Sequence, residues 1–223
     1  MNDTKKTIPK LIYITGIDGS GKSTVSEHLA NTLRKRGYHV NVMWLRFNHV
    51  ISKPFLGLCR LLGYTKYETH DGIRVGYHNF YRSTLISYTF IALQYLDAIR
   101  AKYLHILPKY GKDNTIIVLD RYIYDILIDI AVDTRISHLL SSSIGRKFKN
   151  IMPEDSITIL VKRSLPEILK VRPEGKVDRN FEARFLHYEE LTNEKNLSVI
   201  DNNGTLDVLL STANKITGLS DEV

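Results

Sequence analysis

Residues 11–24 read LIYITGIDGSGKST, and this stretch decides the fold. Its first part, residues 11–14, is a short apolar run that predicts a buried β-strand. A glycine-rich loop follows, and Val25, Leu29 and Leu33 then repeat at the i, i+4, i+8 spacing of an amphipathic helix. Strand, glycine-rich loop and helix in this order are the context in which such a loop binds phosphate.

The loop fits the pattern G-x-x-x-x-G-K-[ST] in full. Its glycines let successive backbone N–H groups turn inward, and the following helix adds its positive end. Lys22 supplies a point charge for the terminal phosphates of ATP, and Ser23 offers a hydroxyl to Mg²⁺. The predicted nucleotide-binding residues are Gly16, Asp18, Gly19, Ser20, Gly21, Lys22, Ser23 and Thr24.

A second apolar run, residues 115–119, ends in Asp120 and is typical of a buried parallel strand. A carboxylate at the end of a neighbouring strand holds the metal in this class of site, directly or through water. Ser23 and Asp120 are therefore the predicted metal ligands.

Strands and helices alternate along the chain, which predicts an α/β fold with a parallel sheet covered on both faces. The expected class is a P-loop NTPase three-layer sandwich with a five-stranded parallel sheet, and residues 1–223 are expected to form one domain. The expected strands are 11–14, 38–45, 115–119, 157–161 and 197–200. The expected helices are one starting near Val25, a short one after Pro54, and 77–107, 123–140, 166–171, 181–191 and 206–216, while residues 46–76 are the least legible.

The 223 residues include 31 basic and 24 acidic side chains, a net charge of +7, and 43% are apolar. This composition is that of a globular protein, and the basic excess permits anionic partners without requiring nucleic acid. The single cysteine, Cys59, excludes an internal disulfide framework. No segment resembles a membrane span or a signal peptide, so a cytoplasmic protein is expected.

A phosphate loop fixes the nucleotide and leaves the reaction open. The chain has no guanine-reading Asn-Lys-x-Asp, and its length suits a small-molecule kinase. It resembles the thymidylate kinase family in four places: the loop wording, Asp120-Arg121-Tyr122, the segment RPEGKVDR at 172–179 followed by Glu182, and Ile200-Asp201. The resemblance covers roughly residues 10–45 and 110–215, and the middle of the chain, residues 46–110, departs from it.

The resemblance implies an ATP- and Mg²⁺-dependent kinase that converts dTMP to dTDP. It implies that Asp18 reaches a sugar hydroxyl of the acceptor and that Arg121 contacts the phosphate that accepts the γ-phosphoryl group. It further implies a lid at about 172–182, whose Arg172 and Arg179 neutralise charge in the transition state. Some members carry an arginine where this chain has Gly19. The predicted catalytic residues are thus Lys22, Arg121, Arg172 and Arg179.

Departures from the family concern the acceptor. Arg46 stands where the family's Arg-Glu-Pro-Gly segment begins, and Arg100 is displaced by two residues from an expected helix position and faces away. Asp125 replaces a serine. The predicted acceptor-binding residues are Asp18, Arg46, Asp120, Arg121 and Asp125.

Asp125, Asp129 and Asp133 repeat at four residues and share one helix face. Two interpretations are open: a solvated acidic face, or an Asp125 that faces the pocket and accepts hydrogen bonds from a sugar or polyol.

Tyr81, Tyr88 and Tyr95 repeat at seven residues and share a face of the expected long helix. A buried or interface stripe and a stacking platform for the acceptor are both open interpretations. The resemblance implies a homodimer through this helix.

Two alternatives to the dTMP hypothesis stay open. One is a kinase of the same fold acting on another small-molecule acceptor: a nucleoside, a sugar or a lipid-linked metabolite. The other is a non-catalytic ATP-binding regulatory protein. No role in nucleic-acid binding is expected, because the basic residues are spread along the chain.

Overall fold

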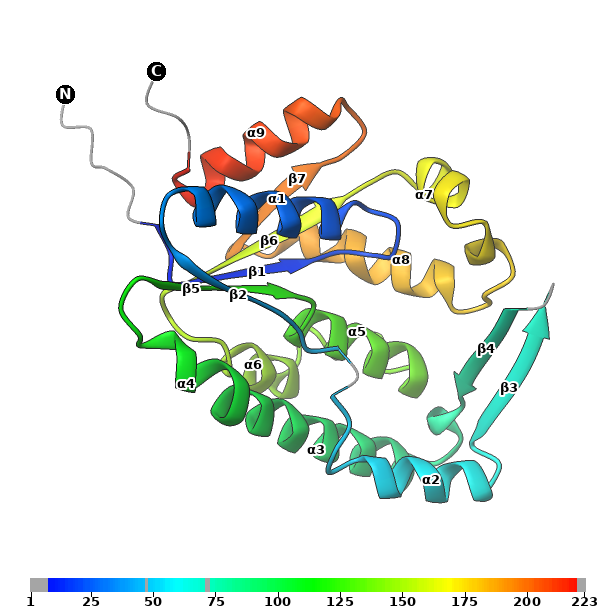
Figure 1. Ribbon diagram of the computed structural model, residues 1–223. Coiled ribbons are helices and arrows are strands. Elements are labelled where there is room, and N and C mark those ends of the chain that lie inside the picture. The colour runs from blue at the N-terminus through cyan, green and yellow to red at the C-terminus, as the bar shows by residue number, and fades with distance from the viewer. Residues whose placement is uncertain (1–7, 47, 71–72, 220–223) are drawn as a thin grey trace.

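The computed structural model describes residues 8–46, 48–70 and 73–219. Five parallel strands form its central sheet in the order β2-β5-β1-β6-β7 (Figure 1). Their bounds are β1 Leu11–Thr15, β2 His39–Trp44, β5 Thr115–Asp120, β6 Ser156–Lys162 and β7 Leu197–Asp201. All five strands predicted from the sequence are confirmed, each within one or two residues.

Helices cover both faces of this sheet (Figure 1). They are α1 Lys22–Lys35, α2 Lys53–Leu61, α3 Thr84–Ala101, α4 Leu107–Tyr110, α5 Ile123–Thr134, α6 Ser143–Lys149, α7 Leu165–Val171, α8 Phe181–Glu190 and α9 Leu206–Thr217. Alternate residues of β1 separate the two cores: Ile12 and Ile14 pack against α1 and α9, whereas Leu11 and Tyr13 pack against α3, α5 and α8. The three-layer α/β sandwich predicted from the sequence is confirmed.

A two-stranded antiparallel hairpin stands apart from this sheet, with β3 at Thr65–His70 and β4 at Ile73–His78 (Figure 1). Residues 46–76 are the least legible part of the sequence: the short helix predicted after Pro54 is confirmed as α2, whereas the hairpin is not foreseen and a long helix is predicted from Tyr77. That start is wrong, because Tyr77 is a buried residue of β4 and α3 begins only at Thr84, where Ser83 caps it by accepting a hydrogen bond from the Ile86 amide.

The long helix is also not uniform. A π-helical turn at Lys102–Ile106 joins α3 to α4. The predicted helix at 123–140 ends earlier, at Thr134, because Arg135 adopts a left-handed conformation with φ of 55°.

The three tyrosines at sevenfold spacing do not share one environment. Tyr88 is exposed, Tyr95 packs edge-on against Phe148, and the Tyr81 ring lies 3.6 Å beneath the Arg135 guanidinium. None of the three lines the cavity that lies beside the phosphate loop network, described below, so the interpretation as a stacking platform is not supported.

Within the described ranges, no helix combines the length and the apolar character that a membrane crossing requires.

Candidate functional site

The parallel register places the phosphate loop beside Asp120. Ile14 of β1 lies opposite Asp120 of β5, so the carboxyl ends of these two strands meet at one edge of the sheet. Ligands of open α/β sheets bind at this edge, where the chain connections leave the sheet in opposite directions.

Left-handed glycines shape the loop, as the motif predicts. Gly16 and Gly21 have φ of 143° and 103°, conformations that a side chain rarely tolerates. A Cβ on Gly16 would lie 2.3 Å from the Val161 carbonyl oxygen, so the loop passes directly over β6. Asn202, at the end of β7, holds the loop from the other side by donating to the Ser20 carbonyl at 2.8 Å.

Lys22 lies inside this loop, only 4% exposed, and its ammonium donates to the Ile17 carbonyl at 2.6 Å. Burial, followed by the neighbouring Arg121, lowers the pKa of Lys22 to about 7. Bound phosphates would favour the charged ammonium, so this position suits an anionic ligand.

The residues predicted to hold Mg²⁺ lie together. The Ser23 hydroxyl donates to Asp120 Oδ2 at 3.3 Å, while Asp120 Oδ1 is buried and has no hydrogen-bond partner among the described residues. Burial raises the pKa of Asp120, an effect that a cation would reverse. In the described parts of the chain no three His, Cys, Asp or Glu side chains form a cluster suited to a metal. The pair therefore fits Mg²⁺, which binds one or two protein groups and is completed by phosphates and water.

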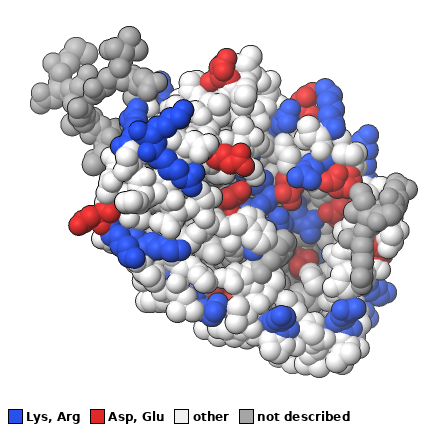
Figure 2. Space-filling view, in the orientation of Figure 1, with Lys and Arg blue, Asp and Glu red and all other residues white. Residues whose placement is uncertain are grey.

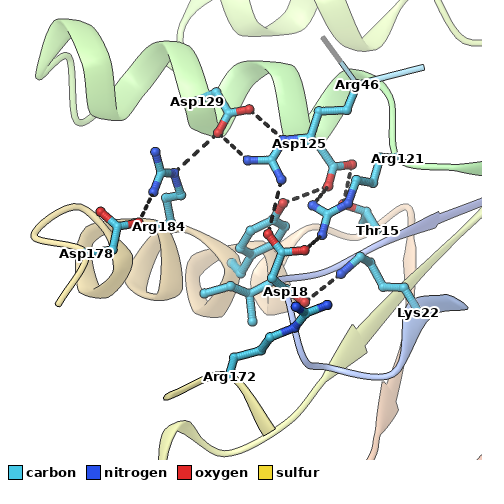
Figure 3. A network of polar contacts seen from close by, with 12 residues as sticks. Thr15, Asp18, Lys22, Arg46, Arg121, Asp125, Asp129, Arg172, Asp178 and Arg184 are labelled. Carbon is cyan, nitrogen blue, oxygen red and sulfur yellow. Dashed lines mark hydrogen bonds and ion pairs between the residues drawn. The ribbon is translucent and has the colours of Figure 1, made fainter. Parts of the chain in front are cut away.

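A network of alternating charges leads away from the loop (Figure 3). Arg121 forms an ion pair with Asp18 of the loop and contacts Asp125 Oδ1 at 3.0 Å. Arg46, at the end of β2, donates twice to Asp129 at 2.8 Å and reaches Asp18 at 3.4 Å. Burial opposes ionisation of Asp18, but Arg121 and then Lys22 hold the pKa of Asp18 below its ordinary value. The predicted residues Asp18, Arg46 and Arg121 are thus brought together.

Asp125 differs from both interpretations made from the sequence. It is completely buried, and its carboxylate accepts hydrogen bonds from Tyr13 and Tyr188 at 2.8 and 2.7 Å, besides the one from Arg121. The Thr15 hydroxyl and the Tyr122 amide donate to it as well, at 3.0 and 3.1 Å. Since five protein donors surround it, Asp125 orients Arg121 and is not available to an acceptor.

The interpretation as a solvated acidic face is also wrong for Asp129 and Asp133. Asp129 is paired with Arg46 and lies 3.4 Å from Arg184, and Asp133 is only 7% exposed. Arg184, which the sequence did not indicate, comes from α8 and also contacts Asp178 at 2.7 Å. No local pattern identifies it, because its two partners lie on other segments.

The two arginines of the predicted lid have different environments. The stem of Arg172 lies over the loop, so that a Cβ on Gly19 would meet Arg172 Cγ at 2.9 Å. This leaves no room for the arginine that some kinases carry at that position. Arg179 is not brought to the loop: it contacts Glu68 at 3.1 Å and stacks on Tyr77 at 3.9 Å, both in the hairpin.

Arg163, a second residue that the sequence did not indicate, does reach the loop. It follows β6 directly, and its Nη1 lies 3.4 Å from the Gly19 carbonyl oxygen. Its Nε is buried without a hydrogen-bond partner in the described part of the chain.

A cavity of about 590 Å³ opens beside the network, between α2, the hairpin, α3, α5 and α8. Figure 2 shows acidic and basic side chains gathered side by side around the hollow on this face. Its lining includes Asp129, Asp133 and Arg184, together with His49, His78 and Gln94. Arg46 joins Asp129 in this wall to Asp18 in the loop, so a chain of ion pairs connects the cavity with the loop.

Asp97 of α3 has a structural role beside the cavity. Its carboxylate accepts hydrogen bonds from the amides of Val50, Ile51 and Ser52 and from the Ser52 hydroxyl. It thereby fixes the segment that enters α2 at the cavity.

The fold and the loop define a protein of the P-loop NTPase class. Within that class, the family model for adenylylsulphate kinase matches residues 8–81. The chain is 36% identical over 72 residues to an adenylyl-sulfate kinase of Vibrio parahaemolyticus serotype O3:K6, and 35% identical over the same length to those of two Vibrio vulnificus strains.

These matches cover 32% of the chain, and the chain spans about a third of the length of each relative. The matched family model includes the loop, α1, β2, α2 and the hairpin, and ends before Asp120 and the lid. The first third is therefore similar to P-loop kinases, and no specific likeness to thymidylate kinases emerges.

Proposed function

We propose that this protein is an ATP- and Mg²⁺-dependent kinase that transfers the γ-phosphoryl group of ATP to a small molecule held in the 590 Å³ cavity. The observation that carries the proposal is the Arg46 bridge, because it joins a phosphate loop to a cavity large enough for a metabolite. The similarity of the first third to adenylyl-sulfate kinases supports it.

The chain's own residues have distinct tasks in this proposal. The loop amides and Lys22 bind the nucleotide phosphates, and Arg163 adds charge beside Gly19. Ser23 and Asp120 would hold Mg²⁺, which supplies charge neutralisation between the β- and γ-phosphates. Arg172, half exposed over the loop, closes on the transferred phosphoryl group, with residues 172–182 as the lid.

The acceptor is less well defined than the reaction. The likeness to adenylyl-sulfate kinases supports an acceptor other than dTMP. The cavity supports the same alternative, because Asp129 in its wall already pairs with the guanidinium groups of Arg46 and Arg184, which a phosphate would otherwise engage.

We also propose a homodimer, formed through the exposed apolar side chains of α3 and the turn after it. Leu85, Tyr88, Leu96 and Tyr103 are 77%, 53%, 46% and 62% exposed. Exposed large apolar side chains that gather on one element commonly mark a protein–protein interface. Sedimentation equilibrium with Leu85→Glu tests it, and a wild-type monomer at micromolar concentration would contradict it.

The kinase proposal is tested by following ADP release and transfer of a radiolabelled γ-phosphoryl group, first to nucleoside monophosphates and then to nucleosides and sugars. Lys22→Ala is the inactive variant and Lys112→Ala, at an exposed loop position, is the matched control. We expect transfer by the wild type and by the control alone. A protein that binds ATP but labels no acceptor would instead be a nucleotide-binding regulator.

A further inference from the structure

The charges at the entrance to the cavity limit what the acceptor is. An acceptor phosphate needs cationic groups with unused charge. The two guanidinium groups between loop and cavity already carry carboxylates: Arg121 contacts Asp18 and Asp125, and Arg46 contacts Asp129 and Asp18. Three carboxylates therefore share two guanidinium groups, and an incoming phosphate would have to displace one of them.

The cavity wall beyond this entrance is rich in uncharged hydrogen-bonding groups. Burial lowers the pKa of His78 to about 4 and also lowers the pKa of His49, so both imidazoles are neutral at pH 7. Gln94 and Thr65 line the same space. Three cations among the described residues line the cavity as well. Arg184 is held by Asp178 and Asp129, whereas Lys53 and Arg60 are exposed on α2, and Arg60 lies over the Tyr67 ring at 5.1 Å. Because Lys53 and Arg60 are screened by solvent, the less exposed part of the wall, with its two neutral imidazoles, Gln94 and Thr65, suits hydroxyls rather than a second anion.

Asp133 is a buried carboxyl group in this wall that lacks a protein partner among the described residues. It is 7% exposed, lines the cavity, and makes no hydrogen bond or ion pair with any residue that the structure describes. Burial and then the adjacent Asp129 raise the pKa of Asp133 well above its ordinary value. A neutral carboxyl group both donates and accepts a hydrogen bond, and a buried one without a partner is costly. A ligand hydroxyl would satisfy it.

We propose that the acceptor is a neutral, polyhydroxylated small molecule phosphorylated on a hydroxyl group, and that Asp133 selects it by binding another of its hydroxyls. This inference rests on the proposed kinase function and adds the chemical class of its acceptor.

The transfer step balances without a further reactant. A lone pair of the acceptor hydroxyl forms the new O–P bond, and the bond from the γ-phosphorus to the β-phosphate oxygen breaks, so ADP leaves with that electron pair. The hydroxyl proton passes to the carboxylate of Asp18, which is 53% exposed and lies between loop and cavity, and then to water. The product is a phosphate monoester.

The chemistry of the labelled product tests this proposal whichever acceptor reacts. Wild-type protein, radiolabelled ATP and Mg²⁺ are incubated with a deproteinised metabolite extract and with the pairs thymidine and dTMP, adenosine and AMP, and ribose and ribose 5-phosphate. We expect label in a product that survives hot dilute acid, as a monoester does, with the neutral member of any reactive pair preferred. Label in an acid-labile phosphoanhydride would overturn the inference.

If no acceptor is labelled, that result contradicts the proposed kinase function. The class of ligand that the cavity binds is then decided by a binding measurement. Equilibrium dialysis with labelled dTMP and AMP is performed in the presence of ADP and Mg²⁺. The wild type should bind both with Kd weaker than about 1 mM, and Asp129→Asn should tighten binding about tenfold by releasing Arg46. Micromolar binding by the wild type, unimproved in the variant, would show a phosphate site.

Asp133→Asn gives a second variant that does not disturb the Arg46 pair. Because it alters the hydrogen-bonding group that faces the acceptor, it should raise KM for the reactive hydroxyl acceptor about tenfold while kcat stays within about twofold. Asp113→Asn, at an exposed position, is the matched control and should leave both constants unchanged. An unchanged KM in Asp133→Asn would remove Asp133 from acceptor recognition.

Discussion

The phosphate loop and the cavity beside it are built in different ways. The turn of the loop is closed by neighbours in sequence, although Asn202 also supports it from the end of β7: the Ser20 amide donates to the Ile17 carbonyl at 3.1 Å, and Lys22 donates to the same oxygen at 2.6 Å. The cavity is held by side chains far apart in the chain, such as Arg46 and Asp129, which are 83 residues apart. The first therefore offers a ligand its backbone geometry, and the second offers side chains whose positions are set by paired charges.

This difference has a consequence for specificity. A backbone cradle accepts any phosphate chain of the right shape, so it defines the donor and changes little when side chains change. A wall made of ion pairs from α5, α8 and the end of β2 is altered by any single substitution, because a buried charge without its partner is costly. The acceptor is therefore the part of the reaction that this fold varies most readily.

The largest effect is expected at the lid. Arg172→Ala should lower kcat by about a thousandfold or more, because it removes the arginine over the loop, and it should leave the urea midpoint unchanged, since Arg172 is half exposed. Arg179→Ala should lower kcat less than about tenfold, because Glu68 and Tyr77 hold that arginine at the hairpin. Steady-state kinetics of both variants decide this, and equal losses would place Arg179 at the nucleotide too.

The next effect concerns the connection between the two regions. Asp125→Ala should reduce the free energy of unfolding by about 3–5 kcal/mol, because it leaves Arg121 buried with one carboxylate fewer and deprives Tyr13 and Tyr188 of their acceptor. Asp113→Ala should change it by less than about 0.5 kcal/mol. Urea unfolding monitored by circular dichroism measures both. A loss below about 1 kcal/mol for Asp125→Ala would mean that this network is not structural.

Substitutions at two glycines distinguish the effect of distorting the phosphate loop from the effect of backbone strain alone. Gly16→Ala should cost about 3 kcal/mol in stability and weaken ATP binding, because its Cβ would meet the Val161 carbonyl at 2.3 Å. Gly37→Ala, with φ of 87° and no atom within 4 Å of the added Cβ, should cost about 1–2 kcal/mol and leave ATP binding unchanged. Calorimetric titration measures the affinity of both variants for ATP. Weakened ATP binding in Gly37→Ala would contradict the assignment of ATP binding to the loop that contains Gly16.

Acid should affect the cavity through His78. Its pKa is about 4 when folded and about 6.5 when unfolded, so between these values the unfolded chain binds more protons and stability falls as the pH falls. The expected contribution is up to about 1.4 kcal/mol per pH unit. His78→Gln should remove it, whereas His138→Gln, at an exposed position, should not. Unfolding curves at pH 6.5, 5.5 and 4.5 compare the three proteins, and parallel slopes would exclude His78 as the cause.

Much of the fold was predictable because its signals are local. The buried strands are continuous apolar runs, and residues 22–35 carry their helical periodicity openly. The hairpin was missed although residues 73–78, IRVGYH, do alternate between apolar and polar, since β3 and β4 pair with each other outside the main sheet and β4 is followed after a short turn by the apolar helix α3. Tyr77 appeared to start a helix for that reason.

The residues of the candidate site likewise include some with a local signal in the sequence and some without one. Lys22, Ser23 and Asp120 follow from the motif and the strand ending. The environment of Asp125 does not, because its partners Tyr13 and Tyr188 lie more than 60 residues away in either direction. Likewise, no spacing within the sequence connects Arg184 to Asp129.

The Arg46 bridge also makes the two binding events interdependent. Arg46 divides its guanidinium between Asp18 in the loop and Asp129 in the cavity wall. A nucleotide that draws Asp18 away leaves Arg46 to Asp129, and a ligand that engages Asp129 leaves Arg46 to Asp18. Each event thus leaves the other carboxylate more firmly paired with Arg46. Thermodynamic linkage requires that each substrate alter the affinity of the other by the same factor, so the sharing of one side chain predicts that donor and acceptor weaken each other's binding.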